Sequence, residues 1–400
     1  MTQAIEWPEK IVVKRPRSYG ITVYADGAAR RHGVDVHGFP EPQIFQALSR
    51  PALSLRNSMK LRHYADRTLC ALLVMMSVGI CQAAEQQRVN IGSLNMTGGK
   101  ISRCDLAYRT YGTLAEDRNN VVLVTTWLAG RTSDQADMIG PGKLVDTNRW
   151  YVVAMDAIGN GVSCSPSNSP IAPRLKFPQF GIRDMVKAQH RLLAMYLGID
   201  HAHAIVGISM GGMQALQWAV MYPDFASKVV TIVGTPHPTE RDLQAWNAEL
   251  AAIERAPGWN DGNYAPGTAF KQLAAIHNGY LWTPGHRAAK TVGTGPSPAG
   301  TLPATASNQS FSTVDWYRQL QAMTSFDLLR HGDMAALAGK IKARLLIITS
   351  EQDRMVDPAP SKALAAQKRA QLLVLNSDCG HMAPACEAGQ VNEAVKAFLK

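Results

Sequence analysis

The 400-residue sequence predicts an α/β fold, with a mainly parallel sheet, helices on both faces and an inserted cap. Three observations lead to this prediction. From residue 88 onward, short apolar runs typical of buried strands alternate with amphipathic segments typical of helices. A serine flanked by glycines lies between one such run and the helix that follows it. Residues 238–325 then interrupt the alternation, as an insertion between two strands would.

The predicted elements follow from these periodicities and from the turn residues between them. The strands are Arg88–Met96, Asp105–Tyr111, Val121–Thr126, Tyr151–Asp156, Ala202–Gly207, Lys228–Gly234, Arg344–Thr349 and Gln371–Leu375. The helices are Ile182–Leu197, Met210–Tyr222, Pro360–Arg369 and Glu387–Leu399.

The insertion at 238–325 is rich in Trp, Asn, Gly and Pro and includes the low-complexity stretch Thr291–Thr305. It contains no clear apolar strand. Placed over the carboxyl ends of the strands, such a segment would act as a cap that shapes a pocket and limits water. A surface insertion without that role is the alternative.

The pentapeptide from Gly207 to Gly211 has the pattern G-x-S-x-G, with Ser209 at its centre. Between a strand and a helix, this pattern is typical of a nucleophile elbow. A serine in so sharp a turn has strained backbone, and a side chain two residues away on either side would collide. The helix N-terminus also leaves N–H groups beside the serine oxygen, where an oxyanion develops in acyl transfer.

A serine nucleophile needs a base, and the base needs an orienting group. In a sheet of this type, the expected order along the chain is serine, acid, histidine. Asp353 follows the apolar run 345–349, and His381 follows the next run, 372–375. Strand positions therefore predict the triad Ser209, Asp353 and His381. Three other carboxylates compete for the role of the acid: Glu351, Asp357 and Asp378.

Several blocks of sequence, in order along the chain, match one known family. They are Ile139–Lys143, Asp146–Arg149, Ile182–Met185 with Ala188 and Gln189, Ser209–Leu216, Trp218 with Ala219, and Tyr222–Asp224. From about residue 88 to the C-terminus, the chain resembles the homoserine O-acetyltransferase family of α/β-hydrolase folds. The resemblance implies Ser209 as nucleophile with Asp353 and His381 as its partners. It also implies an oxyanion hole formed by the backbone N–H groups of Met210 and Leu128.

Two positions depart from the family pattern. The family follows its catalytic histidine with an aspartate that receives the substrate amino group, whereas Met382 follows His381 here. The family also has a cap arginine for the substrate carboxylate, seven residues before a tyrosine; counting back from Tyr280 gives Leu273, with Lys271 as a nearby substitute. A site without both charges should bind a zwitterionic amino acid poorly, because desolvating unpaired charges is costly.

Residues 59–84 have the order of a secretory signal peptide. Met59 precedes a basic stretch, the 13-residue apolar run Leu69–Cys81 and two small residues. A membrane-spanning helix needs about 20 residues, so no stable membrane anchor is expected. We expect Met59 to be the start, residues 1–58 to be a non-native or disordered extension, residues 85–400 to form the α/β-hydrolase domain, and the protein to be periplasmic or secreted. A buried helix in a cytoplasmic protein is the alternative.

Charge and cysteine content bear on partners. The net charge is +10, and residues 1–83, with 11 Lys and Arg against 6 Asp and Glu, carry half of it. No basic run with interleaved aromatic residues follows, so no nucleic-acid partner is expected.

Four cysteines would remain after signal removal, with three full pairings open. A bridge from Cys379 to Cys386 around His381 is one hypothesis, and buried free thiols are the other. No C-x-x-C pair indicates a metal site.

These features favour a serine hydrolase that acts through an acyl-enzyme on a small ester, thioester or amide, without a metal or cofactor. One alternative is an acyltransferase that uses acetyl-CoA and homoserine. A catalytically inactive binding protein is the second. A homodimer is compatible with the sequence, which assigns no substrate-binding side chain.

Overall fold

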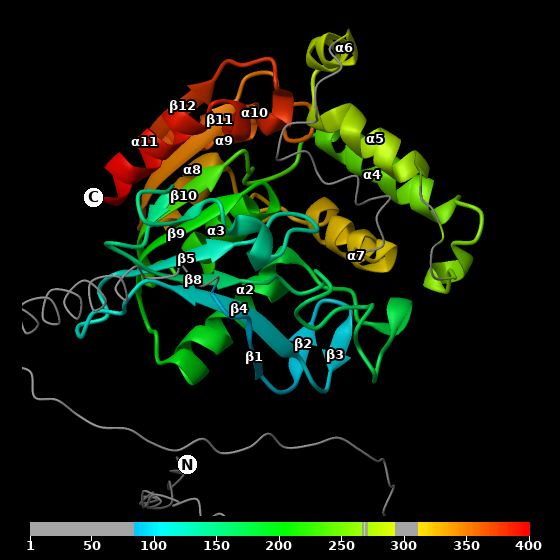
Figure 1. Ribbon diagram of the computed structural model, residues 1–400, viewed down its shortest axis with the longest axis horizontal. Helices are drawn as coiled ribbons and strands as arrows, with labels where there is room; N and C mark the ends of the chain where they lie inside the picture. The colour runs from blue at the N-terminus through cyan, green and yellow to red at the C-terminus, as the bar shows by residue number, and fades with distance from the viewer. Residues whose placement is uncertain (1–83, 266–267, 269–270, 293–310) are drawn as a thin grey trace, which may run out of the picture. The chain divides into compact units, whose positions relative to one another are not determined.

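The computed structural model describes residues 84–265, 268, 271–292 and 311–400 (Figure 1). The predicted extension 1–58 and all of the predicted signal segment except Ala84 lie outside the described residues, as does most of Thr291–Thr305. Among the described helices, none combines the length and the apolar composition needed to cross a membrane.

Eight strands form one sheet. Their order is β1 (Gln87–Asn90), β4 (Asp105–Tyr111), β8 (Tyr151–Met155), β5 (Val121–Thr125), β9 (Ala202–Ile208), β10 (Ala226–Ile232), β11 (Arg344–Ser350) and β12 (Gln371–Leu375). The β1–β4 and β4–β8 pairs are antiparallel, and the strands from β8 to β12 run parallel. All five residues of β5 are buried, as expected of a parallel strand covered on both faces. The predicted mainly parallel sheet is confirmed.

The first predicted strand, Arg88–Met96, is wrong as a single element. The chain forms β1 and then β2 (Leu94–Met96), which pairs with β3 (Gly99–Ile101) in a separate antiparallel sheet. Gly92 lies between β1 and β2 with a φ of 77°, and this left-handed conformation turns the chain. A further small sheet, also not predicted, pairs β6 (Ile139–Gly140) with β7 (Val145–Asp146).

Helices pack against the sheet in two layers. In one layer, α2 (Ile182–Arg191), α3 (Met210–Met221), α8 (Met334–Lys340) and α9 (Pro358–Lys368) contact one another in chain order. In the other, α11 (Ala388–Leu399) contacts β11 and β7.

Three helix predictions need correction. The predicted helix Ile182–Leu197 changes to π-helical geometry at Leu192, and the predicted helix Pro360–Arg369 begins two residues earlier, at Pro358. Helix α8 was not predicted. The last helix begins one residue after its predicted start, because Glu387 (φ −109°, ψ 34°) separates α11 from the short helix α10 (Ala383–Cys386).

The chain between β10 and β11 forms helices α4 (Glu240–Glu254), α5 (Lys271–Leu281), α6 (Pro284–Val292) and α7 (Thr313–Thr324). Helix α4 contacts both α5 and α7, and Figure 1 shows these three helices grouped beside the strand ends. The Leu328 N–H donates to the Pro236 carbonyl at 3.0 Å, which closes the base of the insertion. We refer to residues 238–325 as the cap. No strand occurs among its described residues.

Candidate active site

The strand-to-helix turn at Ser209 has the strained geometry that the glycine spacing predicts. Strand β9 ends at Ile208 and α3 begins at Met210, so Ser209 alone makes the turn, with φ 56° and ψ −123°. A Cβ atom on Gly207 would lie 2.0 Å from the Gly211 carbonyl oxygen. A Cβ atom on Gly211 would lie 2.6 Å from the Thr125 carbonyl oxygen. Both glycines are therefore required by backbone contact, as predicted.

The structure brings Ser209, His381 and Asp353 together in one hydrogen-bonded chain. The Nε2 atom of His381 lies 2.9 Å from the Ser209 hydroxyl, and its Nδ1 atom lies 2.7 Å from an Asp353 carboxylate oxygen. Asp353 and His381 are 2% and 6% exposed, and Ser209 is 9% exposed. A hydroxyl, an imidazole and a carboxylate thus lie in the geometry that serine acyl transfer requires.

The loop after β11 fixes the orientation of Asp353. Its Oδ1 atom accepts hydrogen bonds from the backbone N–H groups of Met355 and Val356, at 2.8 and 2.9 Å. That leaves Oδ2 for the imidazole. The competing carboxylates have other contacts: Glu351 pairs with Lys362, Asp357 caps α9, and Asp378 lies beside His286.

The loop after β12 carries His381 and is closed by a disulfide. Cys379 is bonded to Cys386, with Cα atoms 6.6 Å apart, so the predicted bridge around His381 is confirmed. Gly380 has a φ of 64°, and a Cβ atom there would lie 3.0 Å from the Leu281 carbonyl oxygen of the cap. A second disulfide joins Cys104 to Cys164. Neither the sequence spacing nor the residue types could select this second pairing.

The two N–H groups implied for an oxyanion hole come from different parts of the sheet edge. Met210 is the first residue of α3, so its N–H has no acceptor within the helix. Leu128 lies in the turn 127–130 after β5, which the Gly130 N–H closes on the Trp127 carbonyl at 3.0 Å. Among the described residues, we find no protein acceptor for the Leu128 N–H. Within the described part of the chain, neither N–H group therefore has a protein acceptor.

Cap side chains hydrogen-bond to the loops that carry Asp353, His381 and Leu128. Arg241 donates to the Asp353 carbonyl at 3.0 Å, and Thr283 donates to the Asp378 carbonyl at 2.6 Å. Gln319 accepts from the Ala129 N–H at 2.9 Å. Sequence reasoning missed all three residues. No local pattern marks them, because their partners are about 95–190 residues away.

The positions that depart from the homoserine O-acetyltransferase pattern are apolar in the structure as well. Leu273 lies on α5 and is buried in the hydrophobic core, and Met382 is half-buried against that core. The side chain of Lys271 lies outside the described part of the cap.

One buried carboxylate joins the cap to the segment that follows β8. Asp315, on α7, accepts hydrogen bonds from the backbone N–H and the hydroxyl of Ser167, the former at 2.9 Å. Burial raises the pKa of Asp315 to about 7, against the opposing effects of the Ser167 hydrogen bonds and the Arg131 charge. This carboxyl group therefore changes protonation near neutral pH.

A cluster of metal-ligating residue types includes two residues of the loop that carries His381. His286, Asp378 and Cys379 place one ligand atom each within 4.8 Å of one another, in the described part of the chain. The Cys379 sulfur is bonded to Cys386, so it offers no thiolate for a metal ion.

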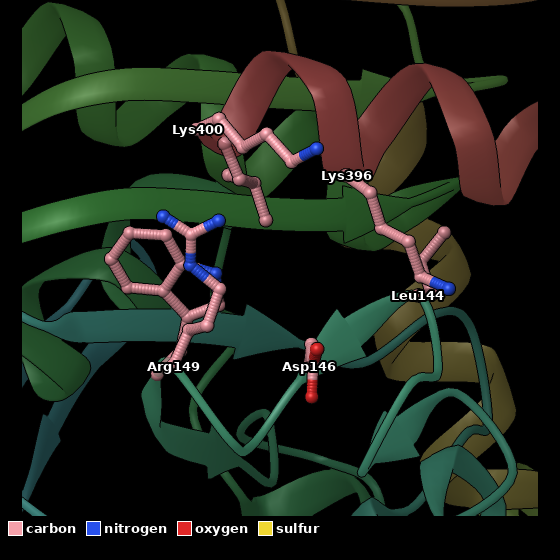
Figure 2. Close-up of a pocket in the computed structure, with 7 residues that line it drawn as sticks. Leu144, Asp146, Arg149, Lys396 and Lys400 are labelled. Carbon is pink, nitrogen blue, oxygen red and sulfur yellow. The ribbon is translucent and has the colours of Figure 1, made fainter.

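A basic pocket of about 220 Å³ lies away from Ser209, where α11 ends beside the start of β8. Figure 2 shows Arg149 and Lys400 on one side and Lys396 on the other, with the Asp146 carboxylate between them. None of these residues is among the predicted site residues.

Comparison with known proteins agrees with this geometry. A model of the alpha/beta hydrolase fold matches residues 119–385. The chain belongs to the α/β-hydrolase fold family. A homoserine O-acetyltransferase of Methanosalsum zhilinae is 31% identical over 348 residues, which cover 76% of this chain and 70% of that protein. A probable esterase of Corynebacterium glutamicum is 30% identical over 322 residues, covering 74% and 89%. The structure of the acetyl esterase MekB matches with a TM-score of 0.72 and 27% identity, over 79% and 95% of the two chains.

The protein is therefore a homoserine O-acetyltransferase-like enzyme of the α/β-hydrolase type. The fold class and the family resemblance that the sequence indicates are both confirmed. This α/β-hydrolase has relatives named for two different reactions, hydrolysis of an ester and acyl transfer to homoserine.

Proposed function

We propose that this α/β-hydrolase hydrolyses small ester-type acyl compounds through an acyl-enzyme on Ser209. The hydrogen-bonded chain from Asp353 through His381 to Ser209 carries the proposal. The esterases among its relatives support hydrolysis as the reaction.

In the first half of the proposed reaction, His381 Nε2 takes the proton of the Ser209 hydroxyl as the oxygen attacks the acyl carbonyl carbon. The carbonyl electron pair moves to oxygen, and the N–H groups of Met210 and Leu128 stabilise that oxyanion. The tetrahedral intermediate then breaks its bond to the leaving group. His381 returns the proton to the departing alcohol, and the acyl group remains on Ser209.

In the second half, water replaces the alcohol. His381 takes a proton from water as its oxygen attacks the acyl-enzyme, and the proton then returns to Ser209 as the acid departs. Asp353 accepts the His381 Nδ1–H throughout and stabilises the imidazolium.

Water is favoured as acceptor because the two positions that pair with the charges of an amino acid in the family are apolar here. Met382 and Leu273 offer neither a carboxylate for an ammonium group nor a cation for a carboxylate. Removing both substrate charges from water without partners would cost several kcal/mol. An uncharged ester avoids that cost.

Acyl transfer from acetyl-CoA to homoserine is the second candidate, and the homoserine O-acetyltransferases among the relatives favour it. The cellular compartment of the enzyme distinguishes these two candidate reactions. Two disulfides fit an oxidising compartment, which supports our proposal that the segment 59–84 directs export. An exported enzyme would have no cytoplasmic acetyl-CoA.

A hydrolysis assay on residues 85–400 tests the proposal. We expect wild-type protein to hydrolyse p-nitrophenyl acetate and to be labelled by a fluorophosphonate, and Ser209→Ala to do neither. Ser133→Ala, which changes an exposed serine, is the matched control. Equal rates for wild type and Ser209→Ala would contradict the proposal. Acetyl-CoA consumption that requires homoserine would instead establish the second candidate, and absence of both activities and of labelling would indicate a binding protein.

A further inference from the structure

Gln319 connects the cap to two loops at the sheet edge. It lies on α7 and is completely buried. Its Oε1 atom accepts from the Ala129 N–H at 2.9 Å, and its Nε2 atom donates to the Ile158 carbonyl at 3.1 Å. Ala129 follows β5 and Ile158 follows β8, so one side chain joins the cap to the ends of two adjacent strands.

The turn that Gln319 contacts has an unfavourable backbone conformation. Ala129 is the third residue of the turn 127–130 and has a φ of 61°. A positive φ at this position is usual for glycine in a turn, and it costs an alanine about 1–2 kcal/mol. A turn that bears this cost rearranges more readily unless it is held in place. The hydrogen bond from the Ala129 N–H to Gln319 ties the third residue of the turn to the cap.

We propose that Gln319 is a positioning residue of the active site. By tying the turn 127–130 to the cap at Ala129, it keeps the N–H of the neighbouring residue Leu128 directed at the place where the oxyanion of the acyl-transfer transition state forms. This inference rests on the proposed function, in which Leu128 supplies one of the two oxyanion donors. It assigns to the cap a part in catalysis that is separate from covering the site.

The size of the expected effect follows from the donor. Loss of one oxyanion-hole donor costs about 10²–10³-fold in kcat, and a displaced donor loses part of that. Substrate binding in the ground state does not need the donor, because the oxyanion exists only in the transition state. Loss of Gln319 should therefore lower kcat and leave KM nearly unchanged.

Gln319→Met, which keeps the length of the side chain but makes neither hydrogen bond, is the main test. We expect kcat for p-nitrophenyl acetate to fall about 10–100-fold, with KM within about 3-fold of wild type. The affinity for a trifluoromethyl ketone, whose hemiketal oxyanion uses the same donors, should fall in parallel with kcat/KM. If Gln319→Met does not fold, Gln319→Asn, whose buried amide is one methylene too short to bridge both loops, is measured in the same way.

Tyr317→Phe on the same helix is the matched control. Tyr317 is also buried, and its hydroxyl donates to Glu254 at 2.8 Å within the cap, so the variant weakens the cap without touching the turn 127–130. We expect its kcat and inhibitor affinity to stay within about 3-fold of wild type. A Gln319→Met enzyme with wild-type kcat, or a loss equal to that of Tyr317→Phe, would overturn the inference.

Ala129→Gly tests the route through the turn, because glycine adopts a positive φ without the cost that alanine bears. Combined with Gln319→Met, it should recover about 3–5-fold in kcat over Gln319→Met alone. No recovery would overturn the route through the turn. A wild-type protein without hydrolysis or fluorophosphonate labelling would reject the proposed function itself, whereas an active wild type with an equally active Gln319→Met would reject only the role of Gln319.

Discussion

The sheet and the cap hold the proposed catalytic groups in different ways. Ser209 continues directly from a buried strand, and Asp353 and His381 each lie within six residues of one, so the core of the sheet fixes where they emerge. The cap instead reaches the loops of Asp353, His381 and Leu128 through side-chain hydrogen bonds. Arg241, Thr283 and Gln319, residues on or beside its helices, make three of them. The comparison indicates that the sheet places the reacting groups and the cap adjusts their orientation. Four predictions test this division of labour, in order of decreasing effect.

The largest effect should come from the acid at the sheet edge. Asp353→Asn should lower kcat about 10⁴-fold, because an amide favours the wrong tautomer of His381 and cannot stabilise the imidazolium. Steady-state kinetics with p-nitrophenyl acetate measures it. Glu351→Gln, in the same loop but exposed, is the control and should keep wild-type kcat. Comparable losses in both variants would mean that the loop, and not the Asp353 carboxylate, is what matters.

Removal of one disulfide should affect stability more, and removal of the other should affect activity more. Cys104 and Cys164 are 60 residues apart, and their replacement by alanine should lower the free energy of unfolding by about 4 kcal/mol. Cys379 and Cys386 are 7 residues apart, so the matching variant should lose only about 2.5 kcal/mol. The second variant should nevertheless lose more kcat, because its bridge encloses His381. Urea unfolding and kinetics on both variants decide, and the reverse order in kcat would contradict the expectation.

Asp315 should make the attachment of the cap depend on pH. Its pKa rises from 3.8 to about 7 on folding, so between these values the folded protein binds a proton that the unfolded chain does not. Its contribution to stability is therefore largest below pH 4, falls as pH rises to about 7, and is constant above. Relative to Asp315→Asn, wild type should lose at most about 4 kcal/mol of unfolding free energy between pH 4 and pH 8. Urea unfolding across that range measures the difference, and a constant difference would exclude this role.

The smallest effect should come from the hydrogen bond between the cap and the loop that carries His381. Thr283→Val removes the hydroxyl that donates to the Asp378 carbonyl, three residues before His381, and should lower kcat about 2–5-fold. The control is Thr324→Val, whose hydroxyl bonds only within α7. A loss in kcat above about 100-fold for Thr283→Val would contradict the proposed division of labour, because the cap would then determine the position of His381 as strongly as the sheet does.

Features that are local or follow from strand order were accessible from the sequence. The fully apolar run of β5 predicts a buried parallel strand, because side chains on both faces must be covered. The glycines around Ser209 predict a turn in which backbone groups approach closely, and the measured contacts agree. Asp353 and His381 were predicted to meet Ser209 because carboxyl ends of parallel strands share one edge of the sheet.

Failures of the sequence predictions have a common physical cause. Gly92 turns the chain between β1 and β2, although the apolar pattern continues through it. Glu387 lies outside α11 although it continues the helical pattern. In each case, the backbone dihedrals of one residue end an element that the side-chain pattern alone would continue.

The sequence by itself determined the sheet, the strand-to-helix turn at Ser209 and the order in which Asp353 and His381 follow it, since strand periodicity, glycine spacing and chain order encode them. Only the tertiary structure decided which cysteines pair, which carboxylate faces His381, and which cap side chains hold the loops. Gln319 and Ala129 illustrate the reason: 190 residues separate them, and neither has a distinctive neighbour in sequence. Their hydrogen bond exists because α7 docks on the sheet edge, and the direction of a docked side chain depends on the packing of the whole cap.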